Sequence, residues 1–361
     1  DLAPALNRTG NMIDSALFAA IAADPVLRQF KLIAEPWDIS RYSLGEFQYP
    51  WREWNDYYRD AVRQFWLGDI ARGFGEGVSA LASSISGSSN IFYFRGPTTS
   101  INFITAHDGF TMNDLVTYHE KRNLANEEDN RDGNNTNRSW NVGVEGPTND
   151  PKINQIRQSL QKSMMATLLL SSGVPMVTMG DEVGRTQHGS NNAFTIPIEL
   201  NSDNWNKEVA WFGGWTLDWN PTGDKKDLQD AFIELIRIRK TYLSDITSEF
   251  FTGRVDFGTE RKDIAWFSLS GNEMDDAHWS DGDKRSLTVF FEAGPKTGLV
   301  LLMNSFGEET TFTLPGSAWG EGMRCIFDSF ETTATYNPEL AAPGAKVQVS
   351  PHSLQVWLVN R

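Results

Sequence analysis

Residues 31–40 read "KLIAEPWDIS", a short and mostly apolar run that ends in Glu35 just before Pro36. We expect residues 31–35 to form a short buried strand, because the run is apolar and a proline ends it. A carboxylate at the end of a buried strand is costly to remove from water. Glu35 is therefore a candidate for chemistry, although a helix cap or a salt bridge explains one such acid equally well.

Two further apolar runs end in acids. Residues 101–106, "INFITA", lead into His107 and Asp108, and residues 174–179, "VPMVTM", lead into the acids at 181–182. We expect both runs to be buried strands as well. In a parallel barrel the carboxyl ends of the strands open on one face, so these acids are expected to converge although they are far apart in the sequence.

Helical patterns separate the apolar runs. Apolar residues recur three and four positions apart in two stretches, which predicts two amphipathic helices. Thr111 followed by Asp114 resembles a capping box that opens a third helix. Short strands that alternate with helices indicate a parallel α/β sheet or barrel. The helix positions are Ile156, Leu160, Met164 and Leu168, then Leu228, Phe232, Leu235 and Ile236, and in the third helix Met112, Leu115, Val116 and His119.

The pattern changes after about residue 245. Short apolar strands separated by Gly, Pro, Asn and Asp follow without a convincing helix, which predicts an all-β domain, most simply a sandwich. We therefore divide the chain into an α/β domain at 1–245 and a β-sandwich at 246–361. The acidic stretch 271–285 is expected to be a solvated loop. The polar tract 126–150 is expected to be a long irregular loop, a kind that tends to be functional or mobile.

Convergent carboxylates suit two kinds of chemistry. They bind metal ions, or they cleave glycosidic bonds, where one acid protonates the leaving oxygen and one carboxylate attacks or activates water. No His-x-x-x-His or Cys-x-x-Cys spacing supports a metal, and His107 taken alone is better explained as a hydrogen-bonded structural histidine. A serine hydrolase is poorly supported, because the sequence has no Gly-x-Ser-x-Gly elbow.

Composition narrows the range of partners. The 361 residues carry a formal net charge of −15, so the surface repels nucleic acid and anionic lipid. No apolar stretch is long enough to span a bilayer. The single cysteine, Cys325, excludes an internal disulfide and favours a reducing compartment, which we take to be the cytoplasm. The 13 tryptophans and 22 phenylalanines serve a core, but flat rings also pack on the apolar face of a pyranose.

Five motifs occur in order along the chain. They are "KLIAEPWDI", "EWNDYYRDAVRQFW", "INFITAHDGFTMNDLV", "NLANEEDNRDG" and "GDEVGRTQHGSNNAF". Together they resemble the glycogen-debranching, isoamylase-type branch of the alpha-amylase superfamily. The resemblance covers nearly the whole chain. It implies an incomplete (β/α)₈ TIM barrel, represented by its later strands, followed by the all-β domain.

The resemblance also implies roles for particular residues. In that family the Glu of "AEPWD" is the general acid/base and the Asp of "HD" stabilises the transition state, which points to Glu35 and Asp108. The position of His107 matches a residue that binds the sugar at the cleavage subsite. The nucleophile is the Asp of a "FRFDLA"-type motif, which the opening "DLAPALNRTG" matches at Asp1. The expected cleft-lining residues are Trp37, Trp54 (for which core packing is an equal alternative), Asn55, Asp181 and Asn192.

The sequence departs from the family pattern in two ways. The barrel strands that precede the nucleophile in the family have no counterpart here, and a closed barrel takes roughly 250 residues. We therefore expect four or five βα units and a possible complementing N-terminal half as a partner. The second departure is the segment 195–214, which lies before "WTLDWN" where the family usually has a shorter connection. This segment bears on the local loop and on the substrate preference.

The function implied by the resemblance is hydrolysis of the α-1,6 branch points of glycogen or a limit dextrin. The expected mechanism is retaining and uses two carboxylates, without a cofactor or a metal. One alternative is a non-catalytic glucan-binding subunit that keeps the acids as relics. Another is an α-glucan transferase of the same superfamily, although the residues of the motifs "AEPWD" and "HDGFT" favour debranching. We expect the isolated chain to hydrolyse glucans weakly.

Overall fold

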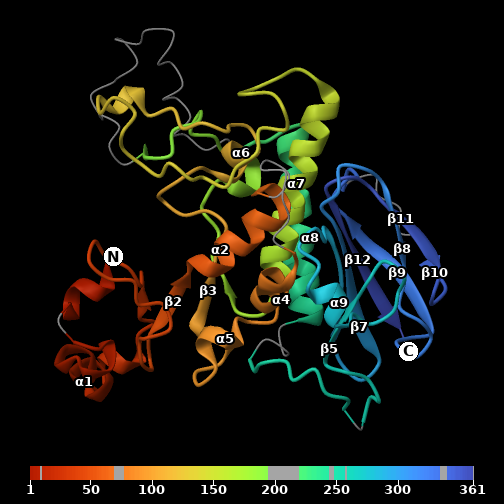
Figure 1. Cartoon of the computed structure of the whole chain (residues 1–361), viewed down its shortest axis with the longest axis horizontal. Helices are drawn as coiled ribbons and strands as arrows, with labels where there is room; N and C mark the ends of the chain where they lie inside the picture. The colour runs from red at the N-terminus through yellow and green to blue at the C-terminus, as the bar shows by residue number, and fades with distance from the viewer. Residues whose placement is uncertain are drawn as a thin grey trace.

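The structure is a computed structural model that describes residues 1–8, 10–68, 77–193, 219–243, 248–256, 258–333 and 340–360. A parallel sheet near the N-terminus, a layer of helices and an antiparallel sheet near the C-terminus follow one another across the molecule (Figure 1). Within the described residues, no helix combines the length and the apolar character needed to cross a bilayer.

Four short strands form the first sheet. They are β1 (Ile33–Ala34), β2 (Arg52–Asn55), β3 (Ser100–Asn102) and β4 (Val174–Pro175), all parallel and hydrogen-bonded in that order. Parallel pairing brings the carboxyl ends of the strands to one edge, where the chain continues into the predicted acids. The α/β character is thus present, and the closure of these strands into part of a (β/α)₈ barrel stays a prediction.

The strands are shorter than the sequence predicts. Within 31–35 only Ile33 and Ala34 pair; the predicted burial is correct for Ala34 and wrong for Ile33, which is 44% exposed. The runs at 101–106 and 174–179 pair over two residues each. Strand β2 was not predicted, because "REWN" alternates polar and aromatic residues without an apolar run. Residues 101–105 are buried as predicted, whereas 174–178 are half-buried and Met179 is exposed, so the predicted burial of that run is wrong. Apolar runs here overstate both the burial and the length of hydrogen-bonded pairing.

Two of the predicted helices are confirmed. They are α7 (Pro151–Leu170) and α8 (Asp224–Tyr242), which pack against each other. The carboxylate of Asp150 caps α7 by accepting a hydrogen bond from the backbone N–H of Lys152. A further helix, α2 (Asp56–Arg63), follows β2 directly and continues as a π-helical turn over Gln64–Gly68. The other described helices are α1 (Ala16–Ala23), α4 (Ser79–Ile85), α5 (Ser89–Phe92), α6 (Met112–Leu115) and α9 (Asp276–Trp279), with 3₁₀ turns at Ala3–Asn7, Met12–Asp14, Leu27–Gln29, Pro97–Thr99, Leu124–Asn126 and Asp181–Val183.

The third predicted helix, α6, is a single turn. Its N-cap is Thr111, whose hydroxyl accepts from the backbone N–H of Asp114, as predicted. The carboxylate of Asp114 does not complete a capping box, because it accepts from the hydroxyl of Thr186 and the backbone N–H of Gln187. His119 lies beyond the helix and is exposed, so its predicted place on the helix face is wrong.

A small aromatic core holds the N-terminal segment against the parallel sheet. Phe18 lies 5.5 Å from Phe47 and 5.1 Å from Trp51 between ring centroids, and all three pack near Ala34 of β1. This contact fixes the first residues of the chain beside the carboxyl end of β1.

The C-terminal part is all-β, as predicted. A six-stranded antiparallel sheet has the order β10-β9-β12-β7-β6-β5, and β11 pairs with β8 in a separate two-stranded sheet. The strands are β5 (Ile264–Phe267), β6 (Ser286–Glu292), β7 (Thr297–Asn304), β8 (Thr310–Thr313), β9 (Gly322–Asp328), β10 (Leu340–Ala341), β11 (Lys346–Val349) and β12 (Ser353–Asn360).

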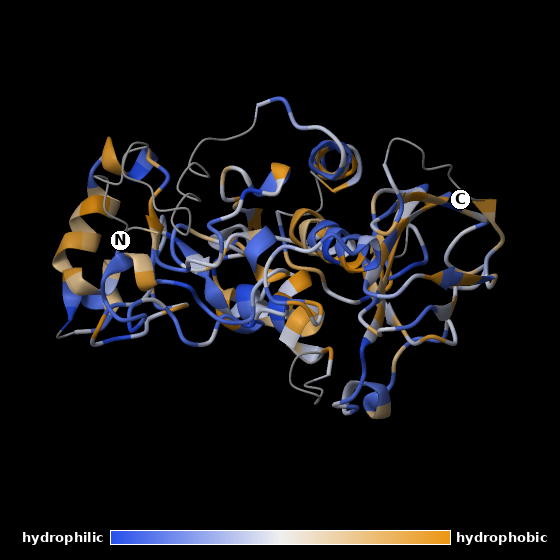
Figure 2. Cartoon of the chain, turned by 90° about the horizontal axis from the view of Figure 1, so that it is seen from above, coloured by the Kyte–Doolittle hydropathy of each residue, from blue (hydrophilic) through white to orange (hydrophobic). Residues whose placement is uncertain are grey.

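Both faces of the six-stranded sheet are covered, which explains its nearly continuous apolar strands. Val289 and Leu301, which are cross-strand partners, pack into the same core cluster as the helices. Their neighbours Phe290 and Val300 point to the opposite face and share a second cluster with Phe312 of the two-stranded sheet. Alternate side chains thus enter two different cores. Figure 2 shows many hydrophobic residues along the antiparallel strands that lie beside the helices.

The two predicted loops are largely as expected. Residues 127–150 form no helix or strand, and 271–285 are mostly exposed, although the one-turn helix α9 lies within them. The intervening segment at 195–214 lies outside the described residues. The proposed boundary between 245 and 246 also lies outside them, so the division into 1–245 and 246–361 stays a prediction.

Candidate active site

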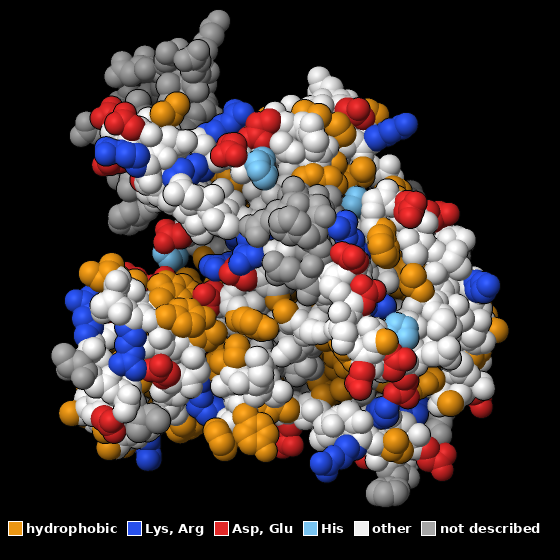
Figure 3. All heavy atoms as spheres, viewed as in Figure 1, with side chains coloured by type: hydrophobic (Ala, Val, Ile, Leu, Met, Phe, Trp, Pro, Cys, Tyr) orange, Lys and Arg blue, Asp and Glu red, His pale blue; other side chains and the backbone are white. Residues whose placement is uncertain are grey.

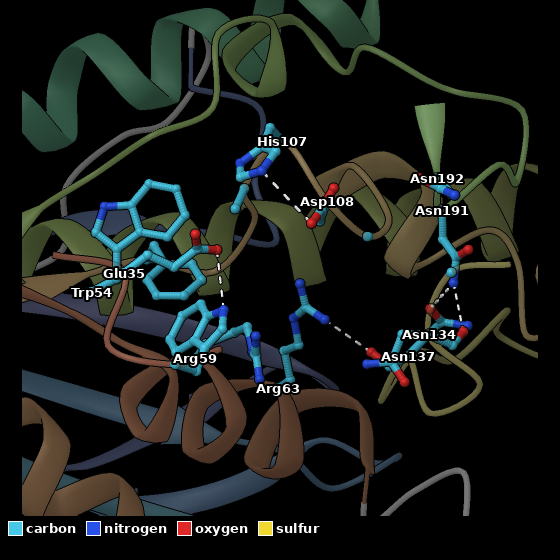
Figure 4. A pocket seen from close by; sticks show the side chains of 15 residues that line it. Glu35, Trp54, Arg59, Arg63, His107, Asp108, Asn134, Asn137, Asn191 and Asn192 are labelled. Carbon is cyan, nitrogen blue, oxygen red and sulfur yellow. Dashed lines mark hydrogen bonds and ion pairs between the residues drawn. The ribbon is translucent and has the colours of Figure 1, made fainter. Parts of the chain in front are cut away.

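A cavity of about 410 Å³ opens at the carboxyl ends of β1, β2 and β3 (Figure 4). The strand ends supply one wall, and α2 with two loops supplies the other. In Figure 3 the surface is hollowed between the N-terminal part of the chain and the loops facing it, with a histidine and acidic side chains at the hollow. We call this space the Glu35 cavity; its lining includes Glu35, Trp54, Arg63, Asp108, Asn137 and Asn191.

Glu35 is held in one orientation at the end of β1. It is 9% exposed, and both of its carboxylate oxygens accept a hydrogen bond. The backbone N–H of Leu2 lies 3.0 Å from Oε2, and the indole N–H of Trp37 lies 3.1 Å from Oε1. The backbone N–H of Ala3 also donates to the carbonyl oxygen of Glu35 over 3.0 Å. The N-terminal segment and the turn after β1 therefore fix this carboxylate together.

Aromatic rings form a continuous wall beside Glu35. The centroids of Trp37 and Trp54 are 6.5 Å apart, and Trp54 lies 5.5 Å from Phe103 and 5.7 Å from His107. All four rings line the cavity. Trp54 comes from β2, so its lining position favours the functional interpretation over plain core packing. Phe103 follows β3 and was not predicted, although it continues the same apolar run that leads to His107.

The "HD" pair projects from the end of β3. The side chains of His107 and Asp108 are largely exposed, and Nε2 of the histidine lies 3.6 Å from Oδ2 of the aspartate. Both line the cavity with Glu35 (Figure 4). Two carboxylates from different strand ends therefore share one space, as the sequence predicts.

Two arginines on the α2 side line the cavity, and neither was predicted from the sequence. Arg59 and Arg63 lie one helical turn apart, and that spacing is the signal that could have identified them. The guanidinium of Arg59 lies 5.7 Å from the centre of the Phe103 ring. Arg63 is buried and donates to the carbonyls of Ile104 and Asn137 over 2.9 and 3.0 Å. Burial lowers the pKa of Arg63 to about 9, so it stays largely protonated at neutral pH.

A network of buried side-chain amides connects the loops that form the wall opposite the strand ends. Nδ2 of Asn123 donates to Oδ1 of Asn191 over 2.7 Å, and Asn191 in turn donates to Oδ1 of Asn137 over 2.7 Å. Gly133 has a φ of +71°, and a Cβ there would lie 2.2 Å from Oδ1 of Asn191. The segments "NLANEEDNRDG" and "GDEVGRTQHGSNNAF" are thus joined by side-chain hydrogen bonds. Asn192, a predicted residue, lines the cavity and donates to Asp132 over 2.9 Å.

Asn55 and Asp181 do not belong to the described lining. Asn55 is fully buried, caps α2 by accepting from the backbone N–H of Tyr58, and donates to the hydroxyl of Ser100. Asp181 is also fully buried and accepts from the backbone N–H of Met112 over 3.1 Å. Burial raises the pKa of Asp181 to about 6. Both predicted lining residues therefore have structural positions behind the cavity wall.

Asp1 lies next to the site, at its edge. It is exposed and is not one of the described residues that line the cavity. Its neighbour Leu2 nevertheless donates to Glu35, so the chain brings Asp1 close to the end of β1.

Comparison with known proteins gives consistent matches. Residues 263–361 match the family described as "Isoamylase, C-terminal". The chain is 39% identical over 340 residues to the glycogen operon protein GlgX homolog of Mycobacterium bovis, covering 89% of this chain and 44% of that protein. It is 38% identical over 325 residues to the glycogen debranching enzyme of Yersinia pestis biovar Antiqua, covering 88% and 44%.

Solved structures share the fold at lower identity. Pullulanase type I of Bacillus subtilis, complexed with maltose, superposes with a TM-score of 0.58 at 18% identity, covering 97% of this chain and 42% of that chain. The catalytic module of the glycogen-degrading pneumococcal virulence factor SpuA also gives 0.58, at 14% identity, covering 97% and 50%. Identity at this level indicates a common fold only.

These matches agree with the order of the motifs along the chain. The chain spans 44% of the length of the curated relatives that it matches, so it corresponds to less than half of such a protein. The matched C-terminal family covers the antiparallel sheets, and the similarity to the relatives extends over most of the chain. Residues 263–361 thus match the C-terminal domain of the isoamylase family, and most of the chain is similar in sequence to a glycogen debranching enzyme and to a GlgX homolog.

Proposed function

We propose that this chain takes part in debranching an α-glucan such as glycogen or a limit dextrin, by hydrolysis of α-1,6 linkages. The observation that carries the proposal is the convergence of Glu35 and Asp108, from two different strand ends, in one cavity walled by aromatic rings. The name of one relative, glycogen debranching enzyme, supports the same substrate class.

The proposed chemistry assigns a role to each acid. Glu35 donates a proton to the departing glycosidic oxygen and later removes a proton from the attacking water. Asp108 stabilises the positive charge that develops at the anomeric carbon. Asp1 is the proposed nucleophile, which forms and then releases a covalent glycosyl ester with overall retention. A retaining mechanism requires about 5–5.5 Å between the two reacting carboxyl groups, against about 6.5–9.5 Å for inversion.

The walls of the cavity suit a neutral polyhydroxyl ligand. Trp37 and Trp54 offer flat apolar faces for pyranose rings. The opposite wall offers amides, including those of Asn134 and Asn192, which can donate to and accept from hydroxyl groups. His107, which lies against Trp54, is proposed to bind the sugar at the cleavage point.

A second function, glucan binding without hydrolysis, is favoured by the position of Asp1. The proposed nucleophile is exposed and outside the described lining, whereas the aromatic and amide walls that bind sugar are in place. In this reading hydrolysis also requires a complementing region, for which we propose an N-terminal half. We place the protein in the cytoplasm, because a sequence with a single cysteine, Cys325, cannot form an internal disulfide and suits a reducing compartment.

Two measurements on the same preparation separate these functions. The chain is incubated with a branched glucan, released reducing ends are measured, and retention on immobilised glycogen is measured in parallel. Debranching predicts release of linear chains together with retention. Retention without release supports the binding function, and the absence of both would contradict the assignment of the cavity to α-glucan.

A further inference from the structure

A second cavity, of about 270 Å³, adjoins the Glu35 cavity along α2. We call it the Tyr42 cavity; its lining includes Tyr42, Asp56, Tyr57, Asp60, Gln64 and Arg138. Neither the predicted site residues nor the mechanism proposed above uses any of these side chains.

The two cavities share one wall. Arg59 lines the first cavity, and the next residue, Asp60, lines the second. In the same way, Arg63 lines the first cavity and Gln64 lines the second. Consecutive helical positions point about 100° apart, so α2 presents neighbouring faces to the two spaces.

The same alternation occurs in the loop opposite α2. Asn137 lines the first cavity and Arg138 lines the second. Arg138 has a φ of +50°, an uncommon conformation for a residue with a Cβ that is often found at functional sites. This backbone turn directs two consecutive side chains into two different cavities.

An aromatic hairpin forms the third part of the wall. Trp37 and Tyr42 pair as an antiparallel bridge across a tight turn. Trp37 lines the first cavity and Tyr42 lines the second. A ring on each side of one hairpin provides two stacking platforms in succession.

Ion pairs fix this wall and keep its charges balanced. Arg59 Nε lies 2.7 Å from Oδ1 of Asp60, and Arg138 Nε lies 3.4 Å from Oδ2 of the same carboxylate. Arg138 also donates to Oε1 of Gln64 over 2.9 Å. Arg59 Nη2 also lies 4.0 Å from Oδ2 of Asp56, so two carboxylates balance the two guanidinium groups and the cavity is a poor site for an anion.

The remaining lining has the groups that recognise sugars. Tyr42 is 56% exposed, and its hydroxyl donates to Oδ1 of Asp56 over 2.7 Å, which fixes the orientation of the ring. Tyr57 adds a second, partly exposed ring. Burial raises the pKa of the Tyr42 phenol, so the hydroxyl remains a donor at neutral pH. Flat rings beside carboxylate and amide acceptors match the apolar faces and hydroxyl groups of a pyranose.

We propose that the Tyr42 cavity binds further glucose units of the α-glucan chain that occupies the Glu35 cavity, with the shared wall between them as the crossing point. This inference rests on the function proposed above and extends it to a second subsite that selects longer chains. A short glucan occupies the aromatic wall of the first cavity alone, whereas a longer one also contacts Tyr42 and Tyr57.

The test compares two ligands, maltotriose and maltoheptaose, by calorimetric titration of the whole chain. Replacement of Tyr42 by Ala is expected to weaken maltoheptaose binding about tenfold, which corresponds to about 1.4 kcal/mol, and to leave maltotriose binding unchanged. Tyr42→Phe keeps the ring and is expected to retain most of the affinity. Tyr93→Ala is the matched control, because Tyr93 is a 70% exposed ring that lines neither cavity.

The outcomes separate this inference from the proposed function. Unchanged maltoheptaose binding in Tyr42→Ala would overturn the second subsite, which would then hold water only. Equal weakening of both ligands would also overturn it, because Tyr42 would then act on the first cavity. If Tyr42→Ala fails to fold, Tyr57→Ala is expected to give the same selective loss. Failure of the unaltered chain to bind either ligand would instead contradict the proposed function, and this inference with it.

Discussion

The backbone N–H of Leu2 donates a 3.0 Å hydrogen bond to Oε2 of Glu35, although 33 positions separate the two residues. Trp37 occupies the other carboxylate oxygen, so Glu35 is held from both sides. The N-terminal segment is itself anchored by the packing of Phe18 on Trp51. The orientation of the proposed proton donor therefore depends on the N-terminal segment and on the turn after β1, which meet at Glu35.

Replacing Trp37 separates its two roles. Trp37→Ala removes the ring and is expected to weaken maltotriose binding about tenfold or more, since a buried aromatic side chain contributes about 1.5–3 kcal/mol. Trp37→Phe keeps an apolar ring and removes only the indole N–H that donates to Glu35. It is expected to bind maltotriose within about threefold of the unaltered chain, or about 0.7 kcal/mol. Calorimetric titration measures both, and equal losses in the two variants would show that the ring does not contact sugar.

Gly133→Ala tests the amide network of the cavity wall. A Cβ at this position would overlap Oδ1 of Asn191 and would also occupy a backbone conformation with positive φ. We expect a loss in the free energy of unfolding from both causes, with the overlap contributing about 1–3 kcal/mol. Gly143→Ala is the control, because Gly143 has a φ of +83° and no atom within 4 Å of an added Cβ. Urea unfolding compares the free energies of unfolding of the two variants, and their difference gives the cost of the overlap. Equal losses would mean that the cavity wall accommodates the added Cβ without cost.

Particular residues show why sequence reasoning found only part of this site. Glu35 and Asp108 were identified because each follows an apolar run, and the carboxyl ends of parallel strands meet at one edge. His107 was assigned to the site only through the family resemblance. Asn123 and Asn191 were missed because their contact joins positions 68 apart, which no local pattern records. Asn55 was misassigned because a polar residue at a strand end can equally cap the next helix, as it does for α2.

The same limit applies to the fold. Helix α7 was predicted because apolar residues recur every four positions from Ile156 to Leu168, within a helix of 20 residues. Strand β2 was missed because its residues Glu53 and Asn55 are polar, yet both are fully buried with partners that lie far along the chain. Burial of a polar residue depends on such tertiary partners, and the partners cannot be recognised before the fold is known.

Asp181 makes the stability of the protein depend on pH. Burial raises the pKa of Asp181 from its ordinary 3.8 to about 6, so between these values the folded state binds more protons than the unfolded state. The free energy of unfolding therefore falls as pH rises from about 4 to 6, by about 3 kcal/mol for a shift of about two pKa units. Asp181→Asn can keep the hydrogen bond from Met112 without the charge, and it should remove this part of the slope.

Urea unfolding at several pH values between 4 and 7 measures that slope. Asp114, whose pKa burial likewise raises to about 6, remains in the variant and adds a similar slope of its own. The difference between the unaltered chain and Asp181→Asn therefore reports Asp181 alone. Parallel curves for the two proteins would refute the buried, titrating state of this carboxyl group.

Lys162→Met tests the connection between the helices and the C-terminal part. Lys162 of α7 is buried, pairs with Asp227 of α8, and donates to the carbonyl of Glu331. Its loss leaves a buried carboxylate without its cation, which typically costs about 3–5 kcal/mol. The control Lys226→Met breaks an exposed pair with Asp230 on α8 and should cost less than about 0.5 kcal/mol. Thermal or urea unfolding compares them, and similar losses would mean that the buried pair contributes little.

The central claim is that Glu35 is the acid/base of an α-glucan debranching site, and the reducing ends released from a branched glucan test it most directly. The unaltered protein is compared with Glu35→Gln at matched concentration, after urea unfolding has shown that the two are equally stable. A group of this kind contributes about 10²- to 10⁴-fold to the rate, so the substitution is expected to abolish nearly all release while retention on glycogen persists. Release by Glu35→Gln at the rate of the unaltered protein would contradict the account.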